Sequence, residues 1–444
     1  MLFSSKEFLF YFLPIFLVIY YLVPARFKNI VLLAGSLYFY YTGEKKWFWV
    51  ILFSICLNFL FTGWMCRCRK RRRRILLGIL LCIDFGMLIG FKYFLGPPLG
   101  ISFYTFQIAA YAIDVYKKPA IYERNFLDFA TYVCMFPQLI AGPIVLFSDV
   151  SKQLKHRKLQ AEHLERGFML FTVGLGYKVL LANMIGNLWT EIQITGIESI
   201  SVPMAWLGAI AFGFQLYFDF QGYSLMAMGL GDMLGFQIPR NFKDPYMAVS
   251  VTDFFRRWHI TLSSWFRNYV YIPLGGNKKG ILRTIMNLFI VWSLTGIWHG
   301  NSWNFLMWGV YYFVWLVLEK FILRPFLKKH NYIGRIYTWF VVFSGWIIFA
   351  LEDWKSIPIY FERMYLHLTD LGAWTANFHV TASALSRYAL LFMIGAVCST
   401  SLPERIYRRF GNKLWFKLGL LAVFWGSFYR VVTAVNNPFL YFRF

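Results

Sequence analysis

Two long apolar stretches flank a basic run in residues 46–95, KWFWVILFSICLNFLFTGWMCRCRKRRRRILLGILLCIDFGMLIGFKYFL. Seven of the eight residues from 67 to 74 are Arg or Lys. The stretches 46–65 and 75–95 are each long enough to cross a bilayer as a helix, which takes about 20 residues. Because cytoplasmic loops carry an excess of Lys and Arg near helix ends, the stretch predicts a helical hairpin whose connection lies in the cytoplasm.

The rest of the chain has the same apolar character. Of its 444 residues, 59% are hydrophobic and only 15% are charged, against about 25% charged in an average soluble protein. With 49 Phe, 28 Tyr and 18 Trp, too little polar surface remains to cover an aqueous globule. The apolar runs are also continuous, unlike the alternating strands of about 10 residues in a transmembrane β-barrel. Composition therefore predicts an all-α polytopic membrane protein.

The net charge of +24 comes from 45 Lys and Arg against 21 Asp and Glu. In a soluble protein this balance would suggest nucleic acid as a partner. Here the basic residues cluster between apolar segments, so we expect loops that face anionic membrane lipids and no nucleic-acid partner. A basic inner face would also attract a polyanionic donor such as a coenzyme A thioester. The six cysteines are scattered without metal-ligand spacing, so no metal site is expected.

The positions of the basic loops predict about twelve crossings, with both termini outside the cytoplasm. No soluble domain is visible, so we expect one integral-membrane domain over residues 1–444. The predicted crossings are 8–23, 29–42, 46–65, 75–95, 99–116, 167–187, 203–232, 284–299, 303–323, 335–351, 386–402 and 414–435.

Two further apolar segments, 126–147 and 250–276, have basic residues on both flanks and cannot be simple crossings. The first contains Pro137 and the pair Gly142-Pro143, which break a helix. Irregular backbone at membrane depth is tolerated only inside protein or beside a wet cavity. Both segments are therefore predicted to be re-entrant pairs of half-helices.

Residues 253–269, DFFRRWHITLSSWFRNY, hold the densest group of ionisable side chains in an apolar setting. Such groups are costly in a membrane and are functional candidates. The candidates here are His259, Arg256, Arg257 and Trp258. The alternative is an amphipathic interfacial helix, with aromatic side chains in the headgroups and arginines in water.

A second candidate lies in residues 294–304, LTGIWHGNSWN, where Trp298 and His299 end a predicted helix. Gly296 and Gly300 would allow close backbone approach, and the polar residues that follow suggest a wet mouth. A histidine here could equally be a packing residue.

A third candidate is Asp219, in the apolar segment QLYFDFQGY, residues 215–223. We expect Arg256 or Arg257 as its partner, and a structural ion pair is as open as a catalytic role. Among these groups, histidine is the side chain best suited to accept a proton near neutral pH. No zinc-protease, nucleophile-elbow or Walker motif occurs.

Taken together, these motifs resemble those of the membrane-bound O-acyltransferases, above all the branch that O-acetylates alginate and peptidoglycan. The resemblance follows the order of the whole chain. At 146, 225 and 268 the chain departs from the family pattern, which weakens any transfer of substrate specificity. The matching segments are 136–144, 216–220, 255–263, 271–277, 294–300 and the tail 437–444.

The resemblance implies a funnel-like fold of about 11–12 transmembrane helices with re-entrant half-helices in the bacterial inner membrane. It implies that His299 is the catalytic residue and that His259 assists it. Substrate binding is expected at a wider group: Arg256, Arg257, Trp258, Trp298, Asp219 and Gln138.

The activity expected from this resemblance is transfer of an acetyl group from cytoplasmic acetyl-CoA to an extracytoplasmic hydroxyl, with no permanently bound cofactor. The acceptor could be a polysaccharide such as alginate, peptidoglycan, or an SGNH-type transferase outside the cytoplasm. Two alternatives stay open: acyl transfer, such as D-alanylation, from an acyl carrier protein, and a transporter that uses the re-entrant segments as its pore.

Overall fold

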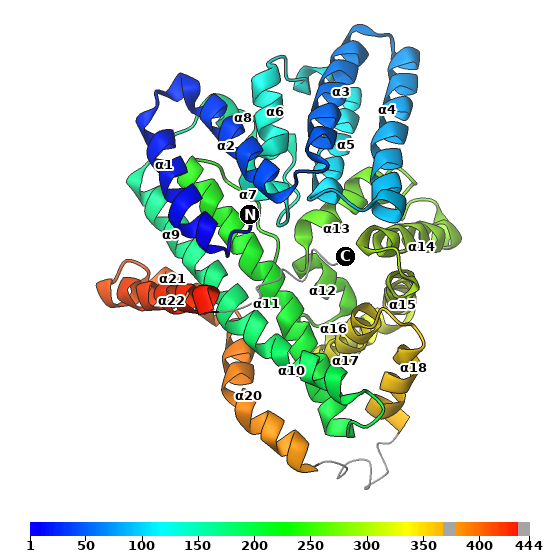
Figure 1. Ribbon diagram of the computed structural model, residues 1–444. Helices are drawn as coiled ribbons and strands as arrows, with labels where there is room; N and C mark the ends of the chain where they lie inside the picture. The colour runs from blue at the N-terminus through cyan, green and yellow to red at the C-terminus, as the bar shows by residue number, and fades with distance from the viewer. Residues whose placement is uncertain (367–377, 434–444) are drawn as a thin grey trace.

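The computed structural model describes residues 1–366 and 378–433, which form helices and no strand (Figure 1). The first half contains α1 (Leu13–Leu22), α2 (Lys28–Gly43), α3 (Phe48–Arg67), α4 (Lys70–Gly90), α5 (Ile101–Lys117), α6 (Phe126–Cys134), α7 (Phe136–Leu139), α8 (Phe147–Lys155), α9 (Ala161–Gly176), α10 (Asn183–Thr195) and α11 (Val202–Leu234). The second half contains α12 (Val251–Arg257), α13 (Ile260–Phe266), α14 (Gly280–His299), α15 (Trp303–Leu318), α16 (Arg324–Lys329), α17 (Asn331–Ala350), α18 (Ser356–Phe361), α20 (Phe378–Cys398), α21 (Leu402–Phe410) and α22 (Leu414–Thr433).

The prediction of an all-helical, multi-span membrane protein is confirmed. Within the described residues, seven helical segments are long and apolar enough to cross a membrane, and Phe8–Leu22 is a shorter apolar helix. Every predicted crossing overlaps a helix, but five of the twelve are not among these seven segments: 8–23, 29–42, 99–116, 203–232 and 414–435. The last two residues of 414–435 lie outside the described part. The matching tail, 437–444, also lies outside it.

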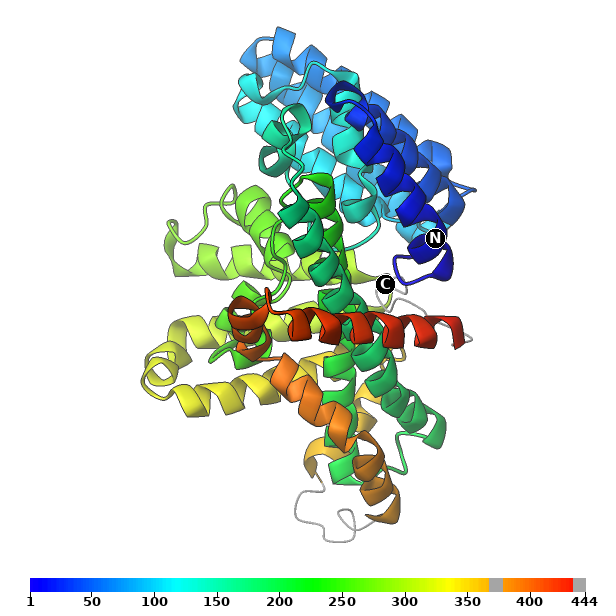
Figure 2. The ribbon, with the colours of Figure 1, turned by 90° about the vertical axis from the view of Figure 1, so that its left-hand side faces the viewer.

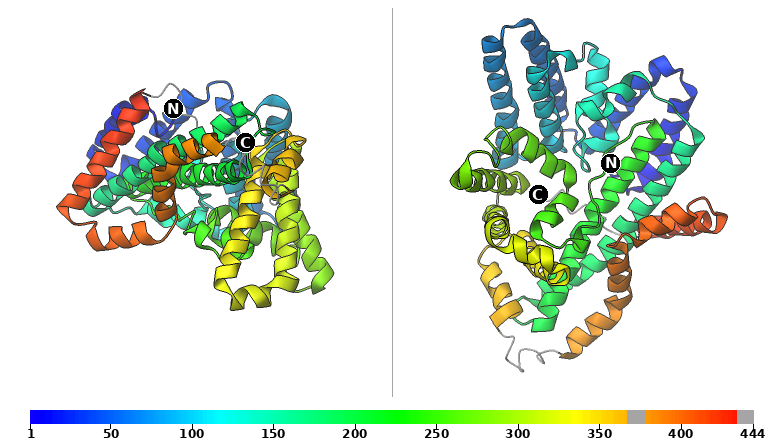
Figure 3. Two further views of the ribbon diagram at one scale, coloured as in Figure 1. Left: turned by 90° about the horizontal axis from the view of Figure 1, so that it is seen from below. Right: turned by 180° about the vertical axis from the view of Figure 1, so that it is seen from behind.

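Both segments predicted to be broken are broken. Residues 126–139 form α6 and α7, which are separated at Met135, and no helix covers 140–146. Residues 251–271 form α12 and α13, separated at Trp258 and His259, and then a π-helical turn. In Figures 1 and 3 the α12–α13 segment lies in the middle of the molecule, between α3–α5 and α15–α17.

The long helix α11 is the axis of the fold, and α9 lies against it with almost no side chain between the two backbones. A Cβ on Gly174 would lie 2.5 Å from the carbonyl oxygen of Gly222, and a Cβ on Gly167 would lie 2.5 Å from that of Gly229. The two pairs repeat at seven residues on both helices, so the contact follows one face of each. Only glycine permits this approach.

A buried ion pair lies one turn from the glycine contact. Lys178, in the π-helical turn that links α9 to α10, places its Nζ 2.6 Å from a carboxylate oxygen of Asp219 on α11. Each side chain is 3% exposed. The predicted partner of Asp219 was therefore wrong. Lys178 holds this place because the close packing of α9 on α11 brings it there.

The basic connections lie on one side of the molecule. Figure 2 shows the α15–α17 connection and α21 on its left, and the N-terminus and the end of α22 on its right. Arg240 also joins α21 to the chain before α12, through an ion pair of 3.0 Å with Glu404. Burial alone would raise the pKa of Glu404, but the guanidinium groups of Arg240 and Arg408 hold this pKa below its ordinary value.

We expect Lys178→Met to lower the free energy of unfolding by about 3–5 kcal/mol, because it leaves the carboxylate of Asp219 buried without its counter-charge. The double variant Lys178→Met/Asp219→Leu should recover most of the loss, because neither charge remains to be desolvated. Thermal unfolding of the detergent-purified protein measures both. A double variant no more stable than the single one would contradict this account.

Candidate functional site

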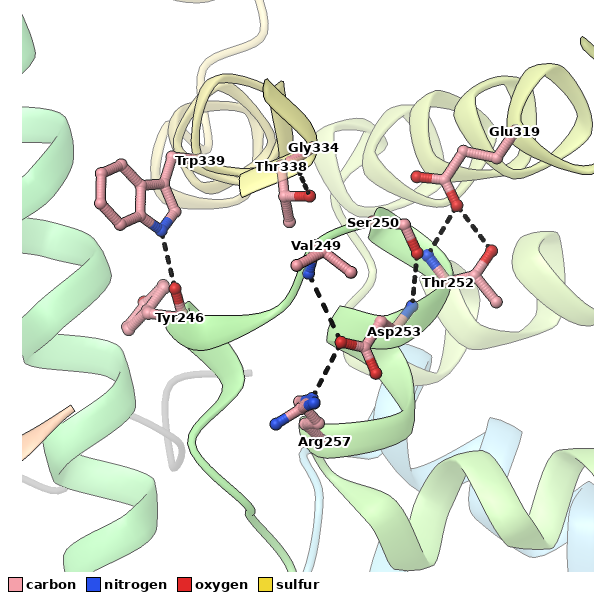
Figure 4. Close-up of polar contacts among 10 residues, drawn as sticks. All are labelled: Tyr246, Val249, Ser250, Thr252, Asp253, Arg257, Glu319, Gly334, Thr338 and Trp339. Carbon is pink, nitrogen blue, oxygen red and sulfur yellow. Dashed lines mark hydrogen bonds and ion pairs between the residues drawn. The ribbon is translucent and has the colours of Figure 1, made fainter. Parts of the chain in front are cut away.

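The short helix α12 is held in place by acidic side chains around its first turn (Figure 4). Glu319, 3% exposed and at the end of α15, accepts hydrogen bonds from the backbone N–H groups of Val251 and Thr252, the latter at 2.9 Å. The Thr252 hydroxyl donates to the same carboxylate at 2.6 Å. A carboxylate at a helix N-terminus stabilises both the free N–H groups and the helix dipole.

Arg257 helps to hold α12 in place, and it does not line the cavity at His259 and His299 that is described below. Its Nε donates to Asp253 at 3.0 Å, and Asp253 also accepts the backbone N–H of Val249 at 3.4 Å. Figure 4 shows both bonds, which close the turn before α12. Arg257 was predicted to bind substrate and is not among the residues that line the cavity.

The helix break at His259 places its side chain in the interior. His259 has a left-handed backbone, with φ +44°, and its side chain is buried. The backbone N–H of Ile260 donates to the carbonyl of Asn241 at 2.9 Å, and that of Lys243 donates to the carbonyl of Arg257 at 2.9 Å. The loop before α12 therefore clamps the break from both sides.

A chain of hydrogen bonds defines which nitrogen of His259 carries its proton. The backbone N–H of Ile144 donates to the hydroxyl oxygen of Thr261 at 2.9 Å, so the Thr261 hydroxyl is free to donate to Asn241 Oδ1, also at 2.9 Å. Asn241 Oδ1 therefore acts as an acceptor, and it lies 3.1 Å from His259 Nδ1. With this orientation of the Asn241 amide, the neutral imidazole carries its proton on Nδ1, and Nε2 is the basic nitrogen.

His299 is the last residue of α14 and lies in an aromatic cage. Its ring centroid is 4.8 Å from that of Trp298, 4.9 Å from that of Trp308 and 5.1 Å from that of Phe349. Helices α14 and α15 pack closely here: a Cβ on Gly296 would lie 2.4 Å from the carbonyl oxygen of Phe305. The predicted close approach at Gly296 is confirmed.

The π-helical turn after α4, Phe91–Leu95, fixes the C-terminus of α14. Lys92 Nζ donates to the carbonyl of Trp298, and the Tyr93 hydroxyl donates to the carbonyls of Ile297 and Gly300 at 3.0 and 3.2 Å. These are carbonyls that a helix end leaves without partners, and a cation there also suits the helix dipole. The turn that carries His299 is thus tied to the α3–α4 hairpin.

Of the three polar residues after His299 that suggested a wet mouth, Asn301 is exposed and Ser302 is half-buried, whereas Asn304 turns inward. Asn304 is fully buried, and its side-chain amide donates to the carbonyls of Ile348 and Phe349 at 3.2 and 3.0 Å. The Ser302 hydroxyl donates to the carbonyl of Glu352 at 3.1 Å. These residues join the α14–α15 turn to the end of α17.

His299 borders two cavities. One, of about 220 Å³, is also lined by His259, Trp258 and two exposed arginines, Arg256 and Arg267. The other, of about 90 Å³, is lined by His299 together with Trp298 and Lys92. Among the described residues that line the larger cavity, none is a carboxylate. Its charge therefore favours an anionic ligand.

The structure brings together most of the predicted site residues. His299, His259, Trp258 and Arg256 share the larger cavity, and Trp298 lies beside His299. Three do not join them: Arg257, which supports α12 as described above, Asp219 and Gln138. Asp219 faces Lys178 at a different cavity, and Gln138 is fully buried on α7, with its amide donating to the carbonyl of Tyr132 at 2.5 Å.

Sequence reasoning missed several residues of the site. Arg267 lies in the same basic run as Arg256 and could have been included on that ground. Lys92 is a cation within a predicted crossing, which is itself a signal. Asn241 carries no such signal, because it lies in a polar loop and is brought to His259 only by the fold.

Comparison with known proteins places this geometry in a family. The profile of the membrane-bound O-acyltransferase family matches residues 95–352, which include both histidines and all the residues that line the larger cavity. The chain belongs to this family. It is therefore an acyltransferase with several membrane spans, and the expected resemblance is confirmed.

Three bacterial relatives illustrate the similarity. The "Probable alginate O-acetylase AlgI" of Pseudomonas fluorescens is 38% identical over 85% of this chain and 77% of that protein. The "Peptidoglycan O-acetyltransferase" of Helicobacter pylori is 32% identical over 80% of this chain and 78% of that protein. The "Teichoic acid D-alanyltransferase" of Streptococcus thermophilus is 27% identical over 51% of this chain and 57% of that protein. The chain thus aligns over more of its length with the O-acetylating relatives.

Asn241→Leu should lower the rate of acyl transfer by roughly 10²-fold, because the ring of His259 loses the acceptor that sets its orientation and tautomer. Asn241→Asp, which keeps an acceptor oxygen at the same place, should recover part of the rate. Ser224→Ala removes only the hydroxyl 3.4 Å from Asn241 Nδ2 and should stay within about threefold of the parent protein.

Turnover of the purified variants tests this assignment, with thermal unfolding to show that all three fold. Equal rates for Asn241→Leu and Ser224→Ala would exclude a positioning role for Asn241.

Proposed function

We propose that this protein transfers an acetyl group from cytoplasmic acetyl-CoA to a hydroxyl acceptor outside the cytoplasm, with His299 as general base. The observation that carries the proposal is that His299 borders two cavities at once. One cavity can hold the donor thioester and the other the acceptor hydroxyl, so both substrates reach the same imidazole.

The donor side is assigned from charge. Arg256 and Arg267 are exposed and line the larger cavity, where they would attract the phosphates of coenzyme A. The helix α14 begins near Lys278, Lys279 and Arg283 and ends at His299. Since basic loops face the cytoplasm, the arginine-bearing side is proposed to be cytoplasmic. With this orientation, the proposal is a protein of the inner membrane whose two termini lie outside the cytoplasm.

The proposed reaction is direct acyl transfer. The acceptor oxygen attacks the thioester carbonyl while His299 takes the hydroxyl proton. The carbon–sulfur bond then breaks, and the same proton passes from His299 to the leaving thiolate, which gives the acetyl ester and coenzyme A. His259, through its basic Nε2, would orient the acceptor or the protonated His299. The indole N–H of Trp298 is a candidate donor to the oxyanion.

The acceptor is proposed to be a polysaccharide or a separate extracytoplasmic transferase of the SGNH type. The first proposal rests on the relatives, whose names refer to alginate, peptidoglycan and teichoic acid. An acyl carrier protein is the alternative donor, because exposed arginines would suit an acidic carrier equally well. The family membership favours an enzyme over a transporter.

His299→Ala should abolish thiol release from acetyl-CoA by the detergent-purified protein, a loss of at least about 10²-fold, because general-base catalysis is removed. His156→Ala, at an exposed position outside both cavities, is the matched control and should keep the parent rate. If His299→Ala released thiol as fast as His156→Ala, His299 would not be the base.

Arg256→Ala should raise the KM for acetyl-CoA several-fold, roughly fivefold, with little change in kcat, because the side chain would bind the donor equally in the ground and transition states. The effect should shrink as salt is added, since the arginine is exposed. Steady-state kinetics at two ionic strengths measures both. No thiol release from the parent protein, together with turnover of an acylated carrier protein, would identify the carrier as donor.

A further inference from the structure

A large polar cavity lies apart from the two cavities at His299. Its volume is about 820 Å³, and its walls come from α10, α11, the segment after α10, and the end of α17 with the residues before α18. Hydrogen-bonding side chains line it on two sides: Asn183, Asn187, Thr190 and Gln193 from α10, and Gln215 and Asp219 from α11. Nothing in the mechanism above uses it.

The deep part of this cavity has no net charge. Lys178 and Asp219 line it as an ion pair, and Lys178 Nζ also donates to Asn183 Oδ1 at 3.0 Å. Both charges are therefore already compensated by the protein. A charged ligand would find no free counter-charge there, whereas a hydroxyl group would find amides and a carboxylate edge.

Gln215 offers an acceptor that the described protein does not use. Its Oε1 is buried and has no hydrogen-bond donor among the described residues. The amide of Gln215 lies directly over Gly186, where a Cβ would come within 2.4 Å of it. The absence of a side chain at 186 thus makes the room that keeps this amide beside the cavity.

The mouth of the cavity is acidic. Glu198, Glu352 and Asp353 are exposed and line it. With Asp219, the cavity is lined by four carboxylates and one cation, Lys178. A polyanion, whether a polyuronate or the phosphates of coenzyme A, would be repelled.

The cavity adjoins the catalytic turn. Ala350 and Leu351 line it and directly follow Phe349, whose ring lies 5.1 Å from that of His299. The hydrogen bonds from Ser302 to Glu352 and from Asn304 to Phe349 link the same segment to the α14–α15 turn. A ligand in the cavity would therefore lie one residue from the wall of the His299 cage.

We propose that this cavity binds an uncharged, hydroxyl-rich saccharide chain, as the acceptor-side site of the acyl transfer proposed above. Amide and carboxylate side chains form hydrogen bonds with sugar hydroxyls. The deep part of the cavity, where the charges of Lys178 and Asp219 cancel, and its acidic mouth both disfavour anionic chains. The inference rests on the proposed function for the role of the saccharide, but the binding itself needs no donor.

The test is calorimetric titration of the detergent-purified full chain with cellotetraose, chitotetraose and tetramannuronate, without any acyl donor. We expect at least one neutral tetrasaccharide to bind, and tetramannuronate to bind at least about tenfold more weakly at low salt, with a smaller difference at high salt. If no neutral tetrasaccharide binds, or if tetramannuronate binds as tightly, the proposal is overturned.

Variants locate the site. Gln215→Leu should weaken binding of the neutral tetrasaccharide roughly tenfold, because the buried acceptor is lost. Gln193→Leu, on the exposed face of α10, should weaken it in the same direction and keeps the test valid if Gln215→Leu fails to fold. Gln160→Leu makes the same chemical change at an exposed position outside the cavity and should bind as the parent does.

The two proposals fail separately. Saccharide binding that depends on Gln215, in a protein that releases no thiol from acetyl-CoA, would overturn the proposed donor chemistry and leave the saccharide site standing. Acetyl transfer to a saccharide, with equal binding by Gln215→Leu and Gln160→Leu, would overturn the site and leave the acyltransferase standing.

Discussion

The contact between the backbones of α9 and α11 is the constraint on which the rest of the structure depends. Membrane helices gain little from burying apolar side chains against each other, since lipid is equally apolar, so close packing must hold them together. Four glycines provide that packing here, and a β-carbon at any of them would meet the opposite backbone below 3 Å. The approach also brings Lys178 to Asp219, and α11 in turn carries Phe220, whose ring lies 4.7 Å from that of His259.

Much of the fold could be predicted because the bilayer imposes a simple rule on hydropathy and loop charge. The apolar runs marked the helices, and Pro137 and the pair Gly142-Pro143 marked the interruption between α6 and α8. Basic clusters such as 67–74 marked the connections between successive helices. None of this depends on which helices touch, so it could be obtained from local sequence alone.

The site was predictable only where a residue was conspicuous in its own segment. His259 and His299 stood out because ionisable groups are rare in apolar surroundings. The predicted ion-pair partner of Asp219 was wrong, because the partner of a buried charge depends on which helices pack together. Lys178, the one basic residue in the predicted crossing 167–187, carried a signal that the nearby arginines obscured. Gln138 was conspicuous through its motif, yet its amide ties α7 to the preceding helix α6 through the carbonyl of Tyr132.

The left-handed backbone of His259 has a consequence for how that position tolerates change. A residue with an ordinary side chain loses about 1–2 kcal/mol in this backbone conformation. The hydrogen bond from Ile260 to the carbonyl of Asn241 holds the conformation in place. Alanine at 259 would thus combine the loss of the imidazole with a backbone that prefers to relax into a continuous α12–α13 helix. Asparagine, which adopts positive φ more readily, would remove the ring and keep the kink. The kink and the imidazole are therefore separable properties of one residue. The imidazole can be replaced without loss of the kink only by a side chain that tolerates positive φ.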